Sequence, residues 1–183
     1  MVNGINTYQI ISTFDGSITN CSLSELSQKL KLNCILAELN ADNTIIDSWP
    51  LVHGTLVTFA VEFADYALKH YAQQKIPEAE ACIALTRRWL KNAHSVSNEE
   101  LTAAADAAYH AADANAAADA AADAAAYAAD AARAAAYAAA YAARDAARAS
   151  ANAAAAANAA GKGREAELIR QGGFVVEYLR AAG

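Results

Sequence analysis

The chain has 183 residues, of which 14 are basic and 20 are acidic, so its formal net charge is −6. Nucleic-acid-binding domains usually carry a clustered basic surface, and the densest basic stretch here is only Arg87-Arg88 with Lys91. We therefore expect no direct contact with nucleic acid, and a basic region of another protein would suit the acidic balance better.

The first fifty residues predict a small mixed unit. Residues 5–14 alternate imperfectly, with Tyr8, Ile10 and Phe14 on one face, which indicates a strand that ends at the turn pair Asp15-Gly16. Ser22 and Glu25 have the spacing of a capping box at the start of a short helix. Two further strands are expected: CILAEL, with Ile35, Ala37 and Leu39 on one side, and TIIDSW after the loop 41–43. The predicted order is β-α-β-β.

Beyond residue 50 the pattern becomes helical. Apolar residues from Leu56 to Tyr71 recur at helical spacing and predict a core-facing helix over about 55–74. Pro77 is placed to begin the next helix, which ends near Asn92, and Ser97 with Glu100 forms a second capping box at the start of a third helix. Large residues on the first two of these helices are expected to supply the core: Phe59, Phe63, Tyr71 and Trp89.

From residue 101 the chain is dominated by alanine. Between 116 and 149, Asp, Tyr and Arg residues recur at a mean spacing close to one helical turn, and acids precede bases as the helix dipole favours. The sequence predicts one helix of roughly 50 Å over 116–149, with a cap at Asp113 or Asn115. The alternative is a single helix over 98–160, because no Gly or Pro interrupts that stretch.

Gly161 and Gly163 are expected to break the run before a last helix that begins near Arg164. Gly172 shares one face of that helix with Leu168, Val175 and Leu179, and close packing against the alanine face would be a reason to tolerate it. The predicted fold class is mainly α: an alanine-rich antiparallel helical bundle over 51–183 with a small N-terminal β-α-β-β unit over 1–50.

The remaining sequence signals are negative or weak. The three cysteines are odd in number and lack a C-x-x-C pair, so we expect free buried thiols and neither a zinc site nor a disulfide framework. The N-terminus has no signal-peptide pattern, and charges interrupt the alanine tract too often for a membrane span. We therefore expect a soluble, cytoplasmic protein without a cofactor, a metal or a membrane partner.

An acidic and tyrosine-bearing stripe is the candidate partner-binding surface. Carboxylates could face a basic partner, and tyrosine offers a large contact area with a polar tip. The plainer interpretations are solubility for the acids, a seam between helices for the tyrosines and an Asp106–His110 pair on a hydrated face. The candidate residues are Asp106, Tyr109, Asp113, Asp119, Asp123, Tyr127, Asp130, Tyr137 and Tyr141.

Three segments, FAVEFADYAL (59–68), PEAEACIALTRRWL (77–90) and SNEELTAAADAAYHAADA (97–114), precede the alanine tract with its recurrent tyrosines. Over about 59–182 the chain resembles the alanine-rich immunity proteins of bacterial polymorphic toxin systems. The resemblance implies a helical bundle that neutralises a partner by binding it, and it transfers no catalytic residue.

Two functions follow as hypotheses. The first is a non-enzymatic inhibitor of a protein partner, most plausibly a toxin or effector. The second is a phage-encoded anti-defence protein, for example an anti-CRISPR inhibitor, whose carboxylates imitate phosphates in the groove of a defence nuclease. An enzyme that uses Asp106 and His110 is a weaker alternative, since no catalytic motif accompanies them. Wide alanine faces also make a homodimer plausible, and the N-terminal unit could be the specificity element or an edge for strand pairing.

Overall fold

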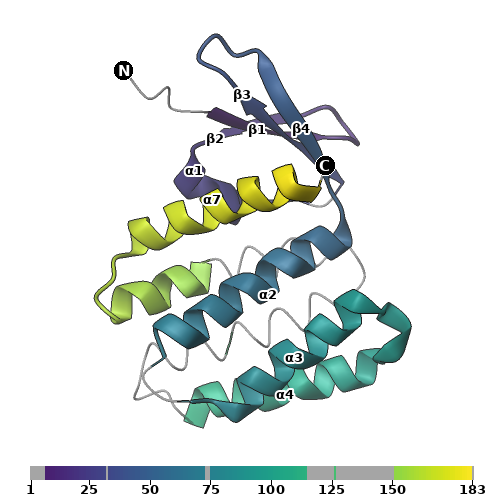
Figure 1. Ribbon diagram of the computed structural model, residues 1–183, viewed down its shortest axis with the longest axis vertical. Coiled ribbons are helices and arrows are strands. Elements are labelled where there is room, and N and C mark those ends of the chain that lie inside the picture. Colours follow the sequence, from purple (N-terminus) through teal and green to yellow (C-terminus); the bar gives the residue numbers. More distant parts are fainter. Residues whose placement is uncertain (1–6, 32, 73–74, 115–125, 127–150, 183) are drawn as a thin grey trace.

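The computed structural model describes residues 7–31, 33–72, 75–114, 126 and 151–182. It confirms a mainly helical fold with a small antiparallel sheet near the N-terminus (Figure 1). The predicted helix over 116–149, and the alternative of one helix over 98–160, lie outside the described residues. The helix that precedes Gly161 is described over 151–159.

The N-terminal unit contains four strands, one more than the sequence predicted. They are β1 (Thr7–Ser12), β2 (Ile18–Cys21), β3 (Cys34–Leu39) and β4 (Ile45–Leu51), and the sheet order is β2-β1-β3-β4 with every pair antiparallel. The order along the chain is therefore β-β-α-β-β. The prediction missed β2 because its sequence, ITNC, is short and half polar, and only its pairing with β1 stabilises it.

Phe14 is not on the buried face of β1 as predicted. Tyr8 and Ile10 are buried, but β1 ends at Ser12 and Phe14 lies in the hairpin turn with 96% of its surface exposed. Because Phe14 has left the strand, its distance in sequence from Tyr8 and Ile10 no longer determines its face. In the turn, the backbone N–H groups of Phe14 and Asp15 donate to the Ser12 hydroxyl oxygen instead.

The inner face of the sheet packs against two helices. Directly paired residues of antiparallel strands share a face, and Ile10, Leu36 and Trp49 form one such row across β1, β3 and β4. All three are buried. The helices α1 (Leu23–Lys29) and α7 (Arg164–Ala182) lie on this side of the sheet, as do the other described helices (Figure 1).

The remaining helices follow the predicted pattern closely. They are α2 (His53–His70), α3 (Pro77–Lys91), the short 3-10 turn η1 (Ala93–Ser95) and α4 (Asn98–Ala114). Phe59 and Phe63 on α2 are completely buried, which confirms the core-facing stripe. Pro77 occupies the first turn of α3, as predicted.

Both predicted capping signals are borne out by hydrogen bonds. The Ser97 N–H donates to the Glu100 carboxylate at 2.8 Å, and the Glu100 N–H donates back to the Ser97 hydroxyl oxygen at 3.1 Å. The Ser22 N–H donates to the Glu25 carboxylate at 2.9 Å at the start of α1. At the break before α7, Gly161 and Gly163 have φ of 70° and 85°, a region that glycine adopts without strain.

Gly172 has a different neighbour from the one predicted. It is buried in α7 against the main chain of Leu23 at the start of α1, and not against an alanine face. Close packing at this glycine was predicted correctly. Its partner was not, because the sequence does not show which element the short helix α1 packs against. The last helix of the chain therefore packs against the first.

Several alanines of the helical part are completely buried in the core. Ala105 and Ala108 on α4, and Ala153, Ala156 and Ala157 in the helix over 151–159, have no exposed surface. Most buried side chains of the sheet and of the helices form one continuous cluster, while Ala37 and Leu39 of β3 lie outside it. The predicted boundary at residue 50 stays a prediction.

The three cysteines are free and buried, as predicted. Within the described part of the chain, no helix combines the length and the apolar character that a membrane crossing requires.

Candidate functional site

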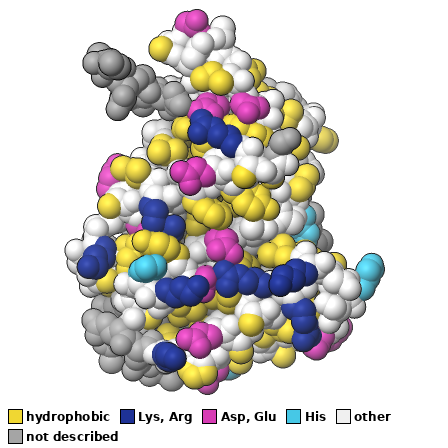
Figure 2. All heavy atoms as spheres, viewed as in Figure 1, with side chains coloured by type: hydrophobic (Ala, Val, Ile, Leu, Met, Phe, Trp, Pro, Cys, Tyr) yellow, Lys and Arg dark blue, Asp and Glu magenta, His cyan; other side chains and the backbone are white. Residues whose placement is uncertain are grey.

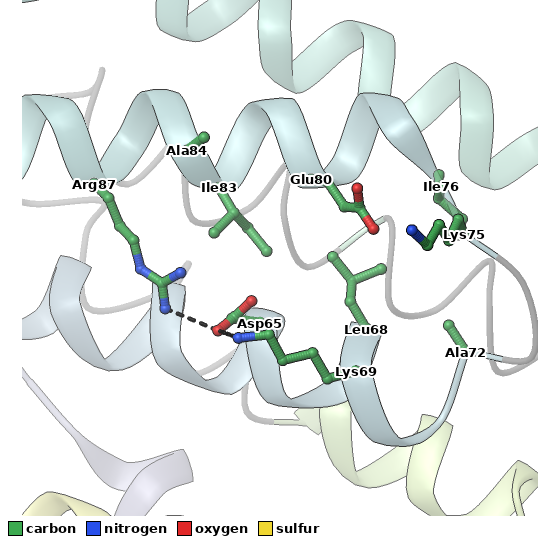
Figure 3. A pocket seen from close by; sticks show the side chains of 10 residues that line it. All are labelled: Asp65, Leu68, Lys69, Ala72, Lys75, Ile76, Glu80, Ile83, Ala84 and Arg87. Carbon is green, nitrogen blue, oxygen red and sulfur yellow. Dashed lines mark hydrogen bonds and ion pairs between the residues drawn. The ribbon is translucent and has the colours of Figure 1, made fainter.

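A groove lies between α2 and α3. It encloses about 670 Å³ between the C-terminal half of α2 and the N-terminal half of α3 (Figure 3). Four apolar residues form the floor: Leu68, Ala72, Ile76 and Ile83.

The rim of the groove is charged, and ion pairs fix one end of it. Arg87 donates to Glu62 at 2.8 Å and to Asp65 at 2.9 Å, so it bridges two successive turns of α2 from its place on α3. Lys69 contacts the same Asp65 carboxylate at 2.6 Å. Figure 2 shows the basic side chains as a band across this face, at the level of α2 and α3, with acidic side chains between them.

The sequence alone allows Arg87 and Arg88 to be solvated or to pair with Glu78 or Glu80 on the same helix. Arg88 is indeed exposed, but neither arginine pairs with these two acids. Instead Arg87 reaches across to α2, and Arg88 lies 3.6 Å from Glu100 on α4. The spacing of Glu80 from Arg87 is seven residues, two turns along the helix, which is too far for a direct pair.

The two cations keep Asp65 ionised. Partial burial by itself would raise the pKa of Asp65, but hydrogen bonds and charge from Lys69 and Arg87 outweigh it and hold the pKa below its ordinary value of 3.8. The rim is therefore a fixed arrangement of charges at neutral pH. At the other end of the groove, beside the α2–α3 connection, Lys75 and Glu80 are exposed and point toward the opening (Figure 3).

A second polar cluster is buried between α2 and α7. The Glu167 carboxylate, almost completely buried, accepts hydrogen bonds from the Tyr71 hydroxyl at 2.5 Å, from Arg170 at 2.6 and 2.8 Å, and from the Gln171 amide at 2.9 Å. Burial, and then the hydrogen bond to Glu167, raises the pKa of the Tyr71 hydroxyl. The Arg170 guanidinium also lies 3.5 Å above the centre of the Tyr66 ring.

A third polar contact joins α7 to the sheet. Glu38 on the inner face of β3 is buried, and Arg180 near the end of α7 donates to both of its carboxylate oxygens at 2.6 Å. In all of these contacts, Glu167 and Glu38 bind other side chains of the same chain. Both carboxylates therefore accept hydrogen bonds from arginines of α7 and help to hold this helix in place.

The thiols are also unsuited to nucleophilic chemistry. Burial raises the pKa of Cys82 to about 12, that of Cys21 to about 11, and that of Cys34 above its ordinary value of 9.0. Thiolates, not thiols, are nucleophiles and metal ligands. Among the described residues, no group of three or more His, Cys, Asp or Glu side chains could hold a metal ion.

The structure places only part of the predicted acidic and tyrosine stripe. Asp106 is exposed on α4, Tyr109 is half-buried and packs against the core, and Asp113 belongs to the last described turn of that helix. The other candidates lie outside the described residues: Asp119, Asp123, Tyr127, Asp130, Tyr137 and Tyr141.

The groove was not predicted from the sequence. Of its floor residues, Leu68 belongs to the apolar stripe of α2 and Ile83 to the apolar face of α3, and periodicity alone cannot separate a covered apolar residue from one that lines a groove. A weak signal was present at Arg87 and Arg88: neither has an acid three or four residues away on its own helix, so any ion pair must come from another element.

No model of a protein family matches the chain. Neither a curated protein nor a solved structure matches it significantly.

Proposed function

We propose that the protein is a non-enzymatic inhibitor, and that it binds a partner protein by receiving apolar side chains of that partner in the groove between α2 and α3. The observation that carries the proposal is the groove itself, an apolar floor bordered by charged side chains that already pair with one another. Interfaces commonly combine an apolar centre with a polar rim and with arginine among the contact residues.

The pre-set rim lowers the cost of binding. Arg87, Asp65 and Lys69 are ordered by mutual ion pairs before any partner arrives, so less side-chain entropy is lost when the interface forms. Lys75 and Glu80 provide charges of both signs at the open end. An amphipathic helix of a partner fits this arrangement, because its apolar face can enter a hydrophobic groove while its flanks meet the charged rim.

Inhibition by occupancy agrees with the chemistry of the described residues. The buried carboxylates of Glu38 and Glu167 are engaged in internal ion pairs, and the thiols are held protonated. The resemblance to immunity proteins of toxin systems indicates a toxin or effector as the partner. The alternative of nucleic-acid mimicry has no support among the described contacts, because Asp119, Asp123 and Asp130 lie outside the described residues.

The test uses two exposed alanines of α3 that lie three positions apart. Ala84 lines the groove and Ala81 does not, so Ala84→Trp fills the groove while Ala81→Trp adds the same bulk elsewhere. The full chain and both variants are immobilised and used for affinity capture from the native host. We expect a protein that is retained by the wild type and by Ala81→Trp and that binds Ala84→Trp at least about tenfold more weakly.

The proposal fails in two ways. A partner that binds Ala84→Trp as tightly as the wild type would place the contact elsewhere. If no captured protein binds the purified wild type in a titration, the binding function itself is contradicted. Inhibition is then measured as loss of the captured partner's own activity on addition of the wild type, and an active partner in the complex would contradict the inhibitor function.

A further inference from the structure

The outer face of the sheet carries one apolar row across all four strands, beside a mostly polar second row, and Ala37 and Leu39 on this face are already buried. Cross-strand pairing places Ile18 opposite Ile11, Ile11 opposite Ile35, and Ile35 opposite Pro50, so these four residues form one row from edge to edge. The row lies on the face opposite to Ile10 and Leu36, since side chains alternate along each strand. Ile18 is 58% exposed, and Ile11 and Ile35 are half-buried.

The rest of this face is uncharged. The second row consists of Asn20, Gln9, Ala37 and Ser48, and the third of Thr7, Leu39 and Ile45. In the second row, the Gln9 amide donates to the Asn20 side-chain oxygen at 3.0 Å, so these two polar groups partly satisfy each other within the sheet. No Asp, Glu, Lys or Arg occurs in any of the three rows, although charged residues make up 19% of the chain.

Strand β3 carries the clearest sign that a second layer belongs here. Its sequence, CILAEL, is apolar on both faces except for Glu38, which points inward and pairs with Arg180. A strand of an antiparallel sheet with one face in water normally alternates apolar and polar residues, and continuous apolar strands are typical of sheets covered on both faces. The described helices cover only the inner face (Figure 1).

We propose that the outer face of the sheet binds a second copy of this chain, with the two sheets packed face to face about a two-fold axis. Such an interface brings each patch against its own copy, so charges on it would meet like charges. This chain carries a net charge of −6, and the outer face presents none of that charge. A neutral apolar face is therefore the surface on which self-association meets the least repulsion.

Other occupants fit less well. A membrane surface rich in anionic lipid attracts clusters of Lys and Arg, and the three rows contain neither. A charged partner protein would find nothing on this face to steer it into place. A sheet of the same shape and composition can interdigitate at the spacing of about 10 Å that is typical of packed sheets.

The size of the outer face limits the affinity expected for the dimer. Four strands about 4.8 Å apart and five to six residues at about 3.3 Å each cover roughly 400 Å² in plane. This is small beside the roughly 800 Å² of accessible surface that each partner buries in a standard interface. We therefore expect a reversible dimer with a dissociation constant in the micromolar range, which depends on protein concentration.

Analytical ultracentrifugation of the full chain from about 1 to about 500 µM tests this proposal across that affinity range. We expect the wild type to shift from monomer to dimer, and Ile18→Lys to weaken the association at least about tenfold by burying an unpaired charge. Ile169→Lys is the matched control, because Ile169 is an exposed isoleucine on α7, away from the sheet. Pro50→Lys, at the other end of the row on the edge strand, should weaken association in the same way.

Circular dichroism and thermal unfolding confirm that each variant is folded, and Pro50→Lys replaces Ile18→Lys if the latter is not. A wild type that stays monomeric at the highest concentration overturns the proposal. A dimer that the row variants and Ile169→Lys affect equally also overturns it, because the interface then lies elsewhere. Neither result bears on the groove between α2 and α3, which is a separate surface.

Discussion

The main-chain carbonyl oxygen of Leu23 lies so close to Gly172 that a β-carbon on this glycine would overlap it. The contact joins α1 to α7, two helices that are separated by most of the chain. Glycine in a helix interior costs about 1 kcal/mol relative to alanine, so its presence requires a compensating gain. Here the gain is the close approach of the last helix to the first.

Gly172→Ala is expected to destabilise the protein by about 2 kcal/mol, because α7 must move away from Leu23 to admit the methyl group. Urea denaturation measures the free energy of unfolding. Gly173→Ala is the control: its β-carbon would meet nothing within 4 Å, so the same substitution one residue later should stabilise the protein by up to about 1 kcal/mol. Equal effects at the two positions would mean that the approach to Leu23 has no energetic importance.

Glu167→Gln is expected to destabilise the protein by about 2 kcal/mol. The substitution keeps the shape of the side chain but leaves the Arg170 guanidinium without a charged partner in a largely buried site. Partial exposure of Arg170 limits the loss. Glu165→Gln, on the exposed first turn of the same helix, should change the free energy of unfolding by less than about 0.5 kcal/mol. Thermal and urea unfolding of both variants distinguish a specific cluster from a general effect of charge.

The Arg180–Glu38 pair should couple α7 to the sheet. Arg180→Met leaves the buried Glu38 carboxylate without its guanidinium, and we expect a loss of about 2 kcal/mol. Adding Glu38→Gln removes the buried charge, so the double variant should be more stable than the sum of the two single losses predicts. Arg164→Met at the exposed start of α7 serves as the control. Additive losses in the double-mutant cycle would contradict a direct interaction.

Cys82 should make the protein less stable in alkali. Burial raises the pKa of Cys82 from 9.0 to about 12, so the folded protein keeps this proton at pH values where the unfolded chain has released it. The contribution is fully present below pH 9.0 and is lost as the pH rises toward about 12. The free energy of unfolding should fall with a slope of up to about 1.4 kcal/mol per pH unit from this group.

Urea denaturation between about pH 8 and 10.5 measures this slope, and Cys82→Ala should flatten it whatever the variant's baseline stability. Cys34→Ala is the comparison, because burial also raises the pKa of Cys34 but the shift there is smaller. An identical slope in the wild type and in Cys82→Ala would show that this thiol titrates alike in the folded and unfolded chains.

Local signals in the sequence predicted most of the described elements. The stripe of α2, Pro77 at the start of α3 and the Ser97–Glu100 capping box all act within one or two helical turns, so a single chain segment contains the whole signal. Strand β3 was predicted at its correct bounds because five of its six residues are apolar and turn-forming residues follow it. Strand β2 was missed because its stability depends on β1 and not on its own composition.

The contacts between distant segments could not be predicted in the same way. Arg87 pairs with Asp65 and Glu62, and Gly172 packs on Leu23, and in both cases the partner belongs to another helix. Helical periodicity gives the face on which a residue lies but not the element that meets this face. The groove, which is made from two such faces, depends on the same missing information.

Glu38 and Arg180 are 142 positions apart, so Glu38 is synthesised long before its partner. Until α7 has been synthesised, the strands can pair, but Ile10, Leu36 and Trp49 have no complete cover. Contacts of such long sequence separation slow folding, since a large loop must close before they form. We therefore expect truncation before α7 to leave this apolar face of the sheet bare and to give a chain that aggregates.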